Sequence, residues 1–113
     1  MRIDAKQALA LWQAASVAAL RADSPDLTQR QFAILLQVYL QPAPHTVRGL
    51  AARLAISKPA VTRALDRLSA LDLVRRKSDE ADRRSILVQR TVAGSVFLRE
   101  FGDLVSGVAA SVP

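Results

Sequence analysis

The side chains best suited to chemistry in this sequence are hydroxyl and basic groups that gather between positions 57 and 67. In the stretch SKPAVTRALDR they recur at helical spacing, because residues three and four positions apart share one face of a helix. The residues predicted to face outward at the start of this helix are Ser57, Lys58, Ala60, Thr62 and Arg63, with Arg67 one turn further along. Hydroxyl groups, a small methyl group and an arginine can read base edges in the major groove of duplex DNA, and a further arginine can reach a phosphate.

A second group of charges lies between Arg75 and Thr91, in the stretch RRKSDEADRRSILVQRT. Two short strands are predicted at 73–78 and 85–91, joined by a polar tip at 79–84. Such a hairpin projects its tip from the protein, and arginines there can enter the narrow minor groove of DNA, where negative potential is concentrated. The candidate DNA-contacting residues of this hairpin are Arg76, Arg83 and Arg84.

The acidic residues of this tip are predicted to shape it. Asp82 lies between Arg76 and the pair Arg83 and Arg84, so charge-assisted hydrogen bonds from these arginines can hold the tip in one conformation. The two other carboxylates of the tip raise the alternative of a metal site. Because arginines surround all three carboxylates, ion pairing is the better interpretation.

The net charge of the chain is +6, and the whole surplus is central. Residues 46–91 carry eleven basic and five acidic side chains, whereas residues 1–45 have a net charge of +1 and residues 92–113 one of −1. A basic segment between nearly neutral flanks is typical of a surface that faces a polyanion. Nucleic acid is therefore the leading candidate partner.

The composition excludes several classes of enzyme and metalloprotein. Cysteine is absent, which removes disulfides, thiolate nucleophiles and cysteine metal sites together. His45 is the only histidine, too little material for a zinc site or a histidine-centred triad. No nucleophile–base pair, metal cluster or phosphate-binding glycine loop is recognisable, so the sequence predicts no catalytic residue, no metal and no cofactor.

These side chains must be positioned by a small, mainly α-helical domain of 113 residues. Asp4 with Gln7, and Thr28 with Gln31, are typical of capping boxes and predict helices over about 5–21 and from position 29. Further helices are predicted at 47–54, at 58–71 and from about 92 onward, which makes about five helices. Two short helices joined by a tight turn match a helix-turn-helix, and a hairpin directly after them predicts a winged helix.

The terminal helices, within residues 1–24 and 92–113 of this single domain, are expected to mediate dimerisation. Both carry apolar side chains that one small domain cannot easily bury, namely Leu9, Trp12, Leu20, Phe97, Phe101 and Leu104. The uncharged stretch 8–20 is too short to span a bilayer, and Asp4 before it is wrong for a basic leader. The sequence therefore predicts a cytoplasmic protein with no membrane partner.

On these residues the sequence resembles the MarR-type winged-helix transcriptional regulators. The resemblance rests on LTQRQFAILL, VRGLAARLAISKPAVTRALDRLSALDLVRR and DEADRRSILVQRTVAG, in this order, over about residues 27–94. It implies a homodimer that binds pseudo-palindromic operator DNA, as a repressor, and releases it on binding a small, often aromatic effector. It also implies a recognition-helix role for 57–63, a minor-groove role for Arg84, and a pair between Asp82 and Arg76 that positions the wing.

The sequence departs from the family pattern at three places. Asp72 stands where the family usually has glycine, and aspartate tolerates the left-handed conformation only at some cost. Arg90 stands where the family usually has leucine, so the base of the wing is expected to be less apolar. The chain stops at Pro113, so the dimerisation region is expected to be shortened and the dimer interface smaller and weaker.

A winged helix that engages another protein, such as a related regulator, is the alternative interpretation. An interaction module of this kind would expose apolar groups on its recognition helix. The second helix of the pair instead presents Lys58, Thr62, Arg63 and Arg67. Sequence-specific binding of double-stranded DNA is therefore the leading prediction.

Overall fold

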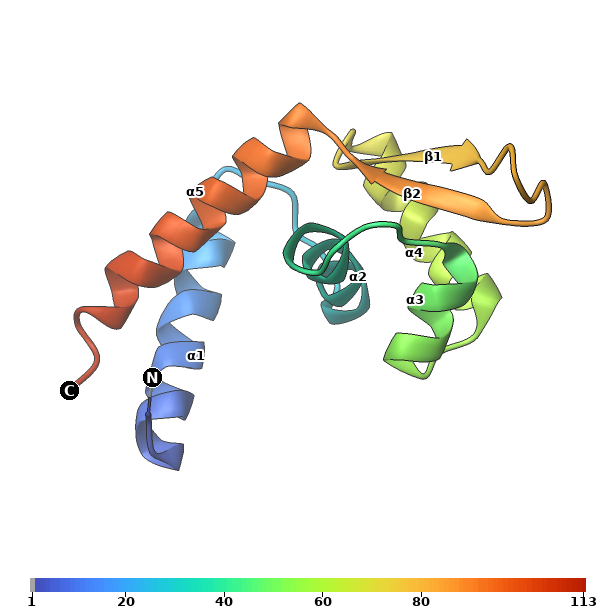
Figure 1. Ribbon diagram of the computed structural model, residues 1–113. Helices are drawn as coiled ribbons and strands as arrows, with labels where there is room; N and C mark the ends of the chain where they lie inside the picture. The colour runs from blue at the N-terminus through green and yellow to red at the C-terminus, as the bar shows by residue number, and fades with distance from the viewer. Residues whose placement is uncertain (1) are drawn as a thin grey trace. The chain divides into compact units, whose positions relative to one another are not determined.

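The computed structural model describes residues 2–113, which form two compact units. Residues 27–96 contain three helices followed by a hairpin: α2 (Gln29–Leu40), α3 (Val47–Leu54), α4 (Lys58–Ala70), β1 (Val74–Ser78) and β2 (Ile86–Arg90). The other unit contains α1 (Ala5–Arg21) and most of α5 (Val92–Ala109) (Figure 1). Five helices and one hairpin in this order confirm the predicted fold class, a mainly α winged helix-turn-helix.

The helices begin where a side chain replaces the hydrogen bonds that the first backbone amides of a helix lack. Thr28 Oγ1 accepts from the Gln31 amide at 3.1 Å, and Gln31 Oε1 accepts from the Thr28 amide at 2.9 Å, which confirms the predicted capping box. Thr46 and Ser57 cap α3 and α4 through the amide three residues ahead. Each such cap stabilises its helix by about 1 kcal/mol.

The core of residues 27–96 is built from the apolar faces of α2, α3 and α4 and from one side of the hairpin. Its buried side chains include Ile34, Leu35, Val38, Leu50, Val61, Leu65, Leu68, Leu73, Val74 and Val88. Burying one such aliphatic side chain contributes about 1.5–3 kcal/mol. Because α4 turns its whole apolar stripe into this core, the direction of its opposite, polar face is fixed.

The hairpin is an antiparallel pair of five-residue strands, within one residue of the predicted bounds. Val74 lies opposite Arg90 at the base, and Ser78 lies opposite Ile86 next to the tip. The hairpin contributes Val74, at the start of β1, and Val88, in the middle of β2, to the core, while the other residues of β1 are exposed. The outer part therefore projects from the helices as a wing.

The returning strand is also joined to the connection between α2 and α3. Thr46 forms an isolated antiparallel bridge with Leu87, and the Val88 amide donates to the His45 carbonyl at 2.8 Å. These contacts extend the hairpin by a short third segment. They hold the middle of β2 against the residues that lead into α3.

In the terminal unit, no residue of α1 is buried. Its N-terminus carries the predicted capping box, in which Asp4 Oδ1 accepts from the Gln7 amide at 2.8 Å. Leu9, Trp12 and Leu20 are 71%, 72% and 75% exposed. No helix within residues 2–113 combines the length and apolar character needed to cross a bilayer.

Candidate nucleic-acid interface

The turn between α3 and α4 sets the direction in which α4 starts. Ala55 ends α3 in the left-handed conformation, with φ of 55°, and the Ile56 amide then donates back to the Ala51 carbonyl at 3.1 Å. Ser57 follows as the N-cap of α4, and Pro59 occupies the first turn, where a missing amide hydrogen costs nothing. A left-handed alanine costs about 1–2 kcal/mol. The tight turn therefore carries a penalty that packing of the two helices must offset.

The exposed face of α4 carries most of the residues predicted to contact DNA. Ser57, Lys58, Thr62, Arg63 and Arg67 are all exposed, whereas Val61, Ala64, Leu65 and Leu68 point into the core. The hydroxyl and basic groups thus share one surface over the first three turns of the helix. This separation matches the pattern expected for a recognition helix.

Ala60 is a correction to the predicted face. Its side chain was expected to point outward, but it is only 6% exposed. One turn along α4 from Ala60 lies Ala64, which is also buried, so both methyl groups belong to the edge of the apolar stripe. The methyl group of Ala60 is therefore not part of the exposed outer face of α4.

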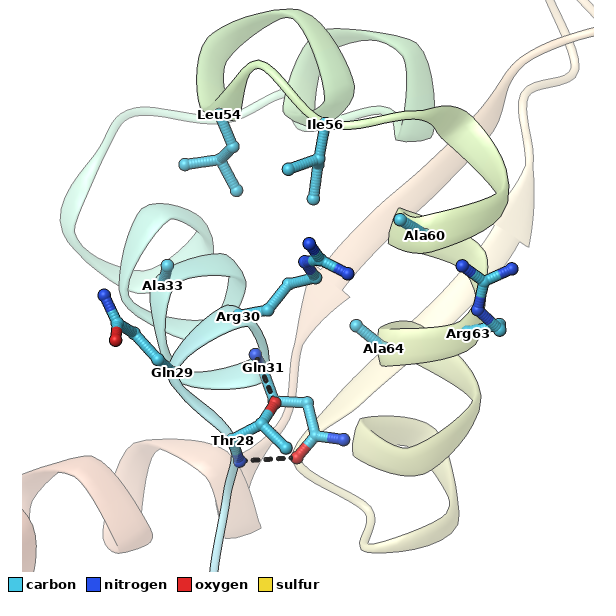
Figure 2. A pocket seen from close by; sticks show the side chains of 10 residues that line it. All are labelled: Thr28, Gln29, Arg30, Gln31, Ala33, Leu54, Ile56, Ala60, Arg63 and Ala64. Carbon is cyan, nitrogen blue, oxygen red and sulfur yellow. Dashed lines mark hydrogen bonds between the residues drawn. The ribbon is translucent and has the colours of Figure 1, made fainter.

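A hollow of about 650 Å³ lies beside this face, between the first turn of α2, the end of α3 and the start of α4. Its lining residues are Thr28, Gln29, Arg30, Gln31, Ala33, Leu54, Ile56, Ala60, Arg63 and Ala64. Figure 2 shows the side chain of Arg30 directed into the hollow from α2, with Ala60 and Ala64 on the facing side of α4 and Arg63 beyond them. The guanidinium group of Arg30 thus lies in a depression next to α4, whose lining also includes Arg63.

Arg30 was not predicted from the sequence to contact DNA. The position of Arg30 could have indicated such a role. Arg30 lies in the first turn of α2, where the positive end of the helix dipole disfavours a cation. A basic residue placed against this local preference is a reason to look for an anionic neighbour or ligand.

Arg76 is the second correction. It was expected to pair with Asp82, but its Nη1 lies 2.8 Å from Asp66 Oδ1 on α4. The reason is geometric, since Arg76 lies in the middle of β1, opposite Val88, while Asp82 belongs to the tip beyond the strands. The ion pair joins the wing to α4 and neutralises the one carboxylate on the outer face of this helix.

Asp82 shapes the wing tip through other partners. Its Oδ1 accepts from the Arg84 amide at 3.1 Å and from Arg84 Nε at 3.5 Å, and its Oδ2 accepts from Ser85 Oγ at 3.3 Å. Asp79 makes a second local turn by accepting from the Ala81 amide at 3.0 Å. These bonds fold the tip, and they leave Arg83 and Arg84 exposed.

Two hydroxyl groups, those of Tyr39 and Thr91, connect the end of α4, the base of the hairpin and the start of α5 by hydrogen bonds. Tyr39 Oη donates to the Leu73 carbonyl at 2.7 Å and accepts from the Thr91 amide at 2.9 Å. Thr91 Oγ1 donates to the Asp72 carbonyl at 2.7 Å and accepts from the Gly94 amide at 2.9 Å. Asp72 has a φ of 59°, so it adopts the left-handed conformation anticipated at this position. The network holds this strained residue in place.

Comparison with known proteins places this arrangement in one family. The sequence model of the MarR family matches residues 26–85, more than half of the chain. No curated protein matches the sequence. A cysteine-to-serine mutant of MarR from E. coli, complexed with operator DNA, is 28% identical, with a TM-score of 0.69 over 93% of this chain and 69% of that chain.

Two further solved structures show the same fold. The transcriptional regulator BldR from Sulfolobus solfataricus is 26% identical, with a TM-score of 0.67 over 92% of this chain and 73% of that chain. A transcriptional regulator from Thermotoga maritima is 21% identical, with a TM-score of 0.76 over 95% of this chain and 72% of that chain. From the family match and the helix–helix–hairpin geometry together, the chain belongs to the MarR family of transcriptional regulators.

Proposed function

We propose that this protein is a sequence-specific double-stranded DNA-binding repressor, with α4 in the major groove and the hairpin in the minor groove. The observation that carries the proposal is the face of α4, which exposes hydroxyl and basic groups and turns its apolar groups inward. Support also comes from the similarity to a MarR protein complexed with operator DNA. The direct test is selection of binding sites from randomised duplex DNA, with enrichment of one motif expected. Absence of any duplex binding at low salt contradicts the proposal, and a protein-interaction module then becomes the better interpretation.

Binding is expected to weaken steeply with salt. Lys58, Arg63, Arg67, Arg83 and Arg84 are the cations placed to neutralise phosphates, and each neutralised phosphate adds about −0.9 to the slope of log affinity against log salt. Lys58→Gln should lower this slope by about 1 and weaken binding to all sequences alike. The affinity is measured over a salt series by fluorescence anisotropy.

The matched control for Lys58→Gln is Lys6→Gln in α1. Lys6 is also exposed but lies in the terminal unit, outside the proposed DNA-contacting surface. Its replacement should leave the slope unchanged. Equal slopes for wild type and Lys58→Gln would show that Lys58 neutralises no phosphate.

We propose that the protein acts as a homodimer through its terminal helices, so that two recognition helices read half-sites about one helical turn apart. Trp12 and its exposed apolar neighbours on α1 are the support for this contact surface. Sedimentation at tens of micromolar (roughly the range well above the dissociation constants of specific dimers) should give the mass of a dimer. Trp12→Asp should shift it to a monomer, whereas Leu40→Asp, a change at an equally exposed apolar residue in the other unit, should not. A monomeric wild type refutes this assembly.

The remaining partner of the proposed function is a small aromatic effector that releases DNA, as the family resemblance implies. If such an effector binds, adding it should lower the affinity of the protein for duplex DNA. In the absence of DNA, the effector should raise the free energy of unfolding only by the amount that ligand binding itself contributes.

A further inference from the structure

Arg90, the last residue of β2, makes three contacts with the C-terminal end of α2. Its Nε donates to the Val38 carbonyl at 2.9 Å, and its Nη2 donates to the Gln41 carbonyl at 3.0 Å. Its guanidinium also lies over the ring of Tyr39, 5.8 Å from the centroid. One side chain thus binds two carbonyls and an aromatic ring of a helix that is about fifty residues away in the sequence.

The sequence of α2 explains why this end of the helix needs a donor. The Val38 carbonyl would normally accept from the amide four residues ahead, but that residue is Pro42, which has no amide hydrogen. The last carbonyls of a helix also form the negative end of its dipole, where a cation is stabilising. A planar guanidinium can satisfy two acceptors at once and stack on a ring, which an ammonium group cannot do in the same way.

We propose that Arg90 is a positioning residue for the wing, acting as a clasp between β2 and α2. The other contacts of β2 with this region are the backbone interactions of Leu87 and Val88 near the middle of the strand and the burial of the Val88 side chain in the core. At the base of the hairpin, Arg90 adds a side-chain contact from the strand itself, next to the hydrogen bonds of Tyr39 with the Leu73 carbonyl and the Thr91 amide. The orientation of β2 relative to the helices, and with it the placement of Arg84 at the tip, is then defined.

The inference rests on the proposed DNA binding and is tested by a double-mutant cycle. Arg84→Ala should weaken duplex binding in the wild type, and its effect should be at least about threefold smaller in an Arg90→Leu background, because the tip is already misplaced. Arg63→Ala should have the same fold effect in both backgrounds, since α4 does not depend on the clasp. Arg90 is an exposed residue, so the Arg90→Leu variant is expected to fold.

Two outcomes of this cycle overturn the proposal. If Arg90→Leu and Arg84→Ala are additive, Arg90 acts independently of the wing tip. If Arg90→Lys restores full affinity, the positive charge suffices and Arg90 is simply another phosphate contact. Non-additivity with Arg84 together with failure of Arg90→Lys to restore affinity supports the clasp.

A measurement without DNA separates failure of this inference from failure of the proposed function. Amide hydrogen exchange in free Arg90→Leu protein should be faster within β1 and β2 than in the wild type, while exchange in the core of α4 stays the same. Unchanged exchange in the hairpin overturns the clasp even if DNA is bound. Faster exchange in the hairpin of a protein that binds no duplex supports the clasp and refutes only the DNA-binding function.

Discussion

Replacing Arg63 by alanine is expected to weaken binding to the preferred duplex by about 1–3 kcal/mol and to relax the preference at one base pair. Arg63 is exposed in the second turn of α4, has no acidic partner within residues 2–113, and extends from a helix held rigidly by its buried stripe. Arginine can donate to O6 and N7 of one guanine together, and this bidentate contact is lost for any other base. The measurement is the affinity of wild type and variant for a panel of single-base variants of the selected site.

Arg84→Ala is the comparison that distinguishes reading of one base pair by Arg63 from sensing of groove width by the wing. Arg84 is held in an exposed tip by Asp82 and is expected to sense groove width, so its loss should weaken all narrow-groove sites together. Asp82→Ala should act as a milder form of Arg84→Ala, since Asp82 orders the tip and touches no base. If Arg84→Ala left every affinity unchanged while Arg63→Ala abolished binding, the wing would have no role in recognition.

The largest effect on folding is expected from Gly94→Ala at the start of α5. A methyl group on Gly94 would overlap the hydroxyl of Tyr39 and the carbonyl of Leu73, which are hydrogen-bonded to each other. Because the Leu73 carbonyl is backbone in the core, it cannot move aside as an exposed side chain can. Overpacking of this kind costs about 1–3 kcal/mol, and a displaced hydrogen bond adds about 1 kcal/mol. Thermal and urea unfolding of the variant measure the loss.

The same helix provides the control. Gly102 has no heavy atom within 4 Å of where its methyl group would lie, so Gly102→Ala meets no obstacle. Alanine is favoured over glycine inside a helix by about 0.5–1 kcal/mol, so this variant should be slightly more stable than the wild type. Equal stability of the two alanine variants would show that the contact of Gly94 with Tyr39 is not tight in solution.

Features encoded locally could be predicted from the sequence. Each capping box, at Asp4 and at Thr28, is a motif of only four consecutive residues that marks the start of a helix, and the structure has both. Pro59 after Ser57 likewise defined the start of α4, and the short apolar run Ile86-Leu87-Val88 indicated the returning strand. Each of these signals depends on neighbours in the sequence, so no tertiary information was needed.

Features that depend on contacts between distant elements could not be predicted in the same way. The helical spacing placed Ala60 near the outer face, but only the packing of the helices around the hollow shows that its methyl group is covered. Arg76 has carboxylates near it in sequence, yet the nearest one in space comes from α4. The role of Arg90 was hidden for the same reason, since its two acceptors lie near position 40.

The ion pair between Asp66 and Arg76 also makes the loss of one partner unequal to the loss of the other. Losing Arg76 removes a cation and leaves an unpaired carboxylate on the outer face of α4. Losing Asp66 removes a negative charge and frees a cation beside the proposed path of the DNA. Of the two single losses, that of Asp66 is therefore expected to be the milder for duplex binding, because interacting residues do not contribute independently.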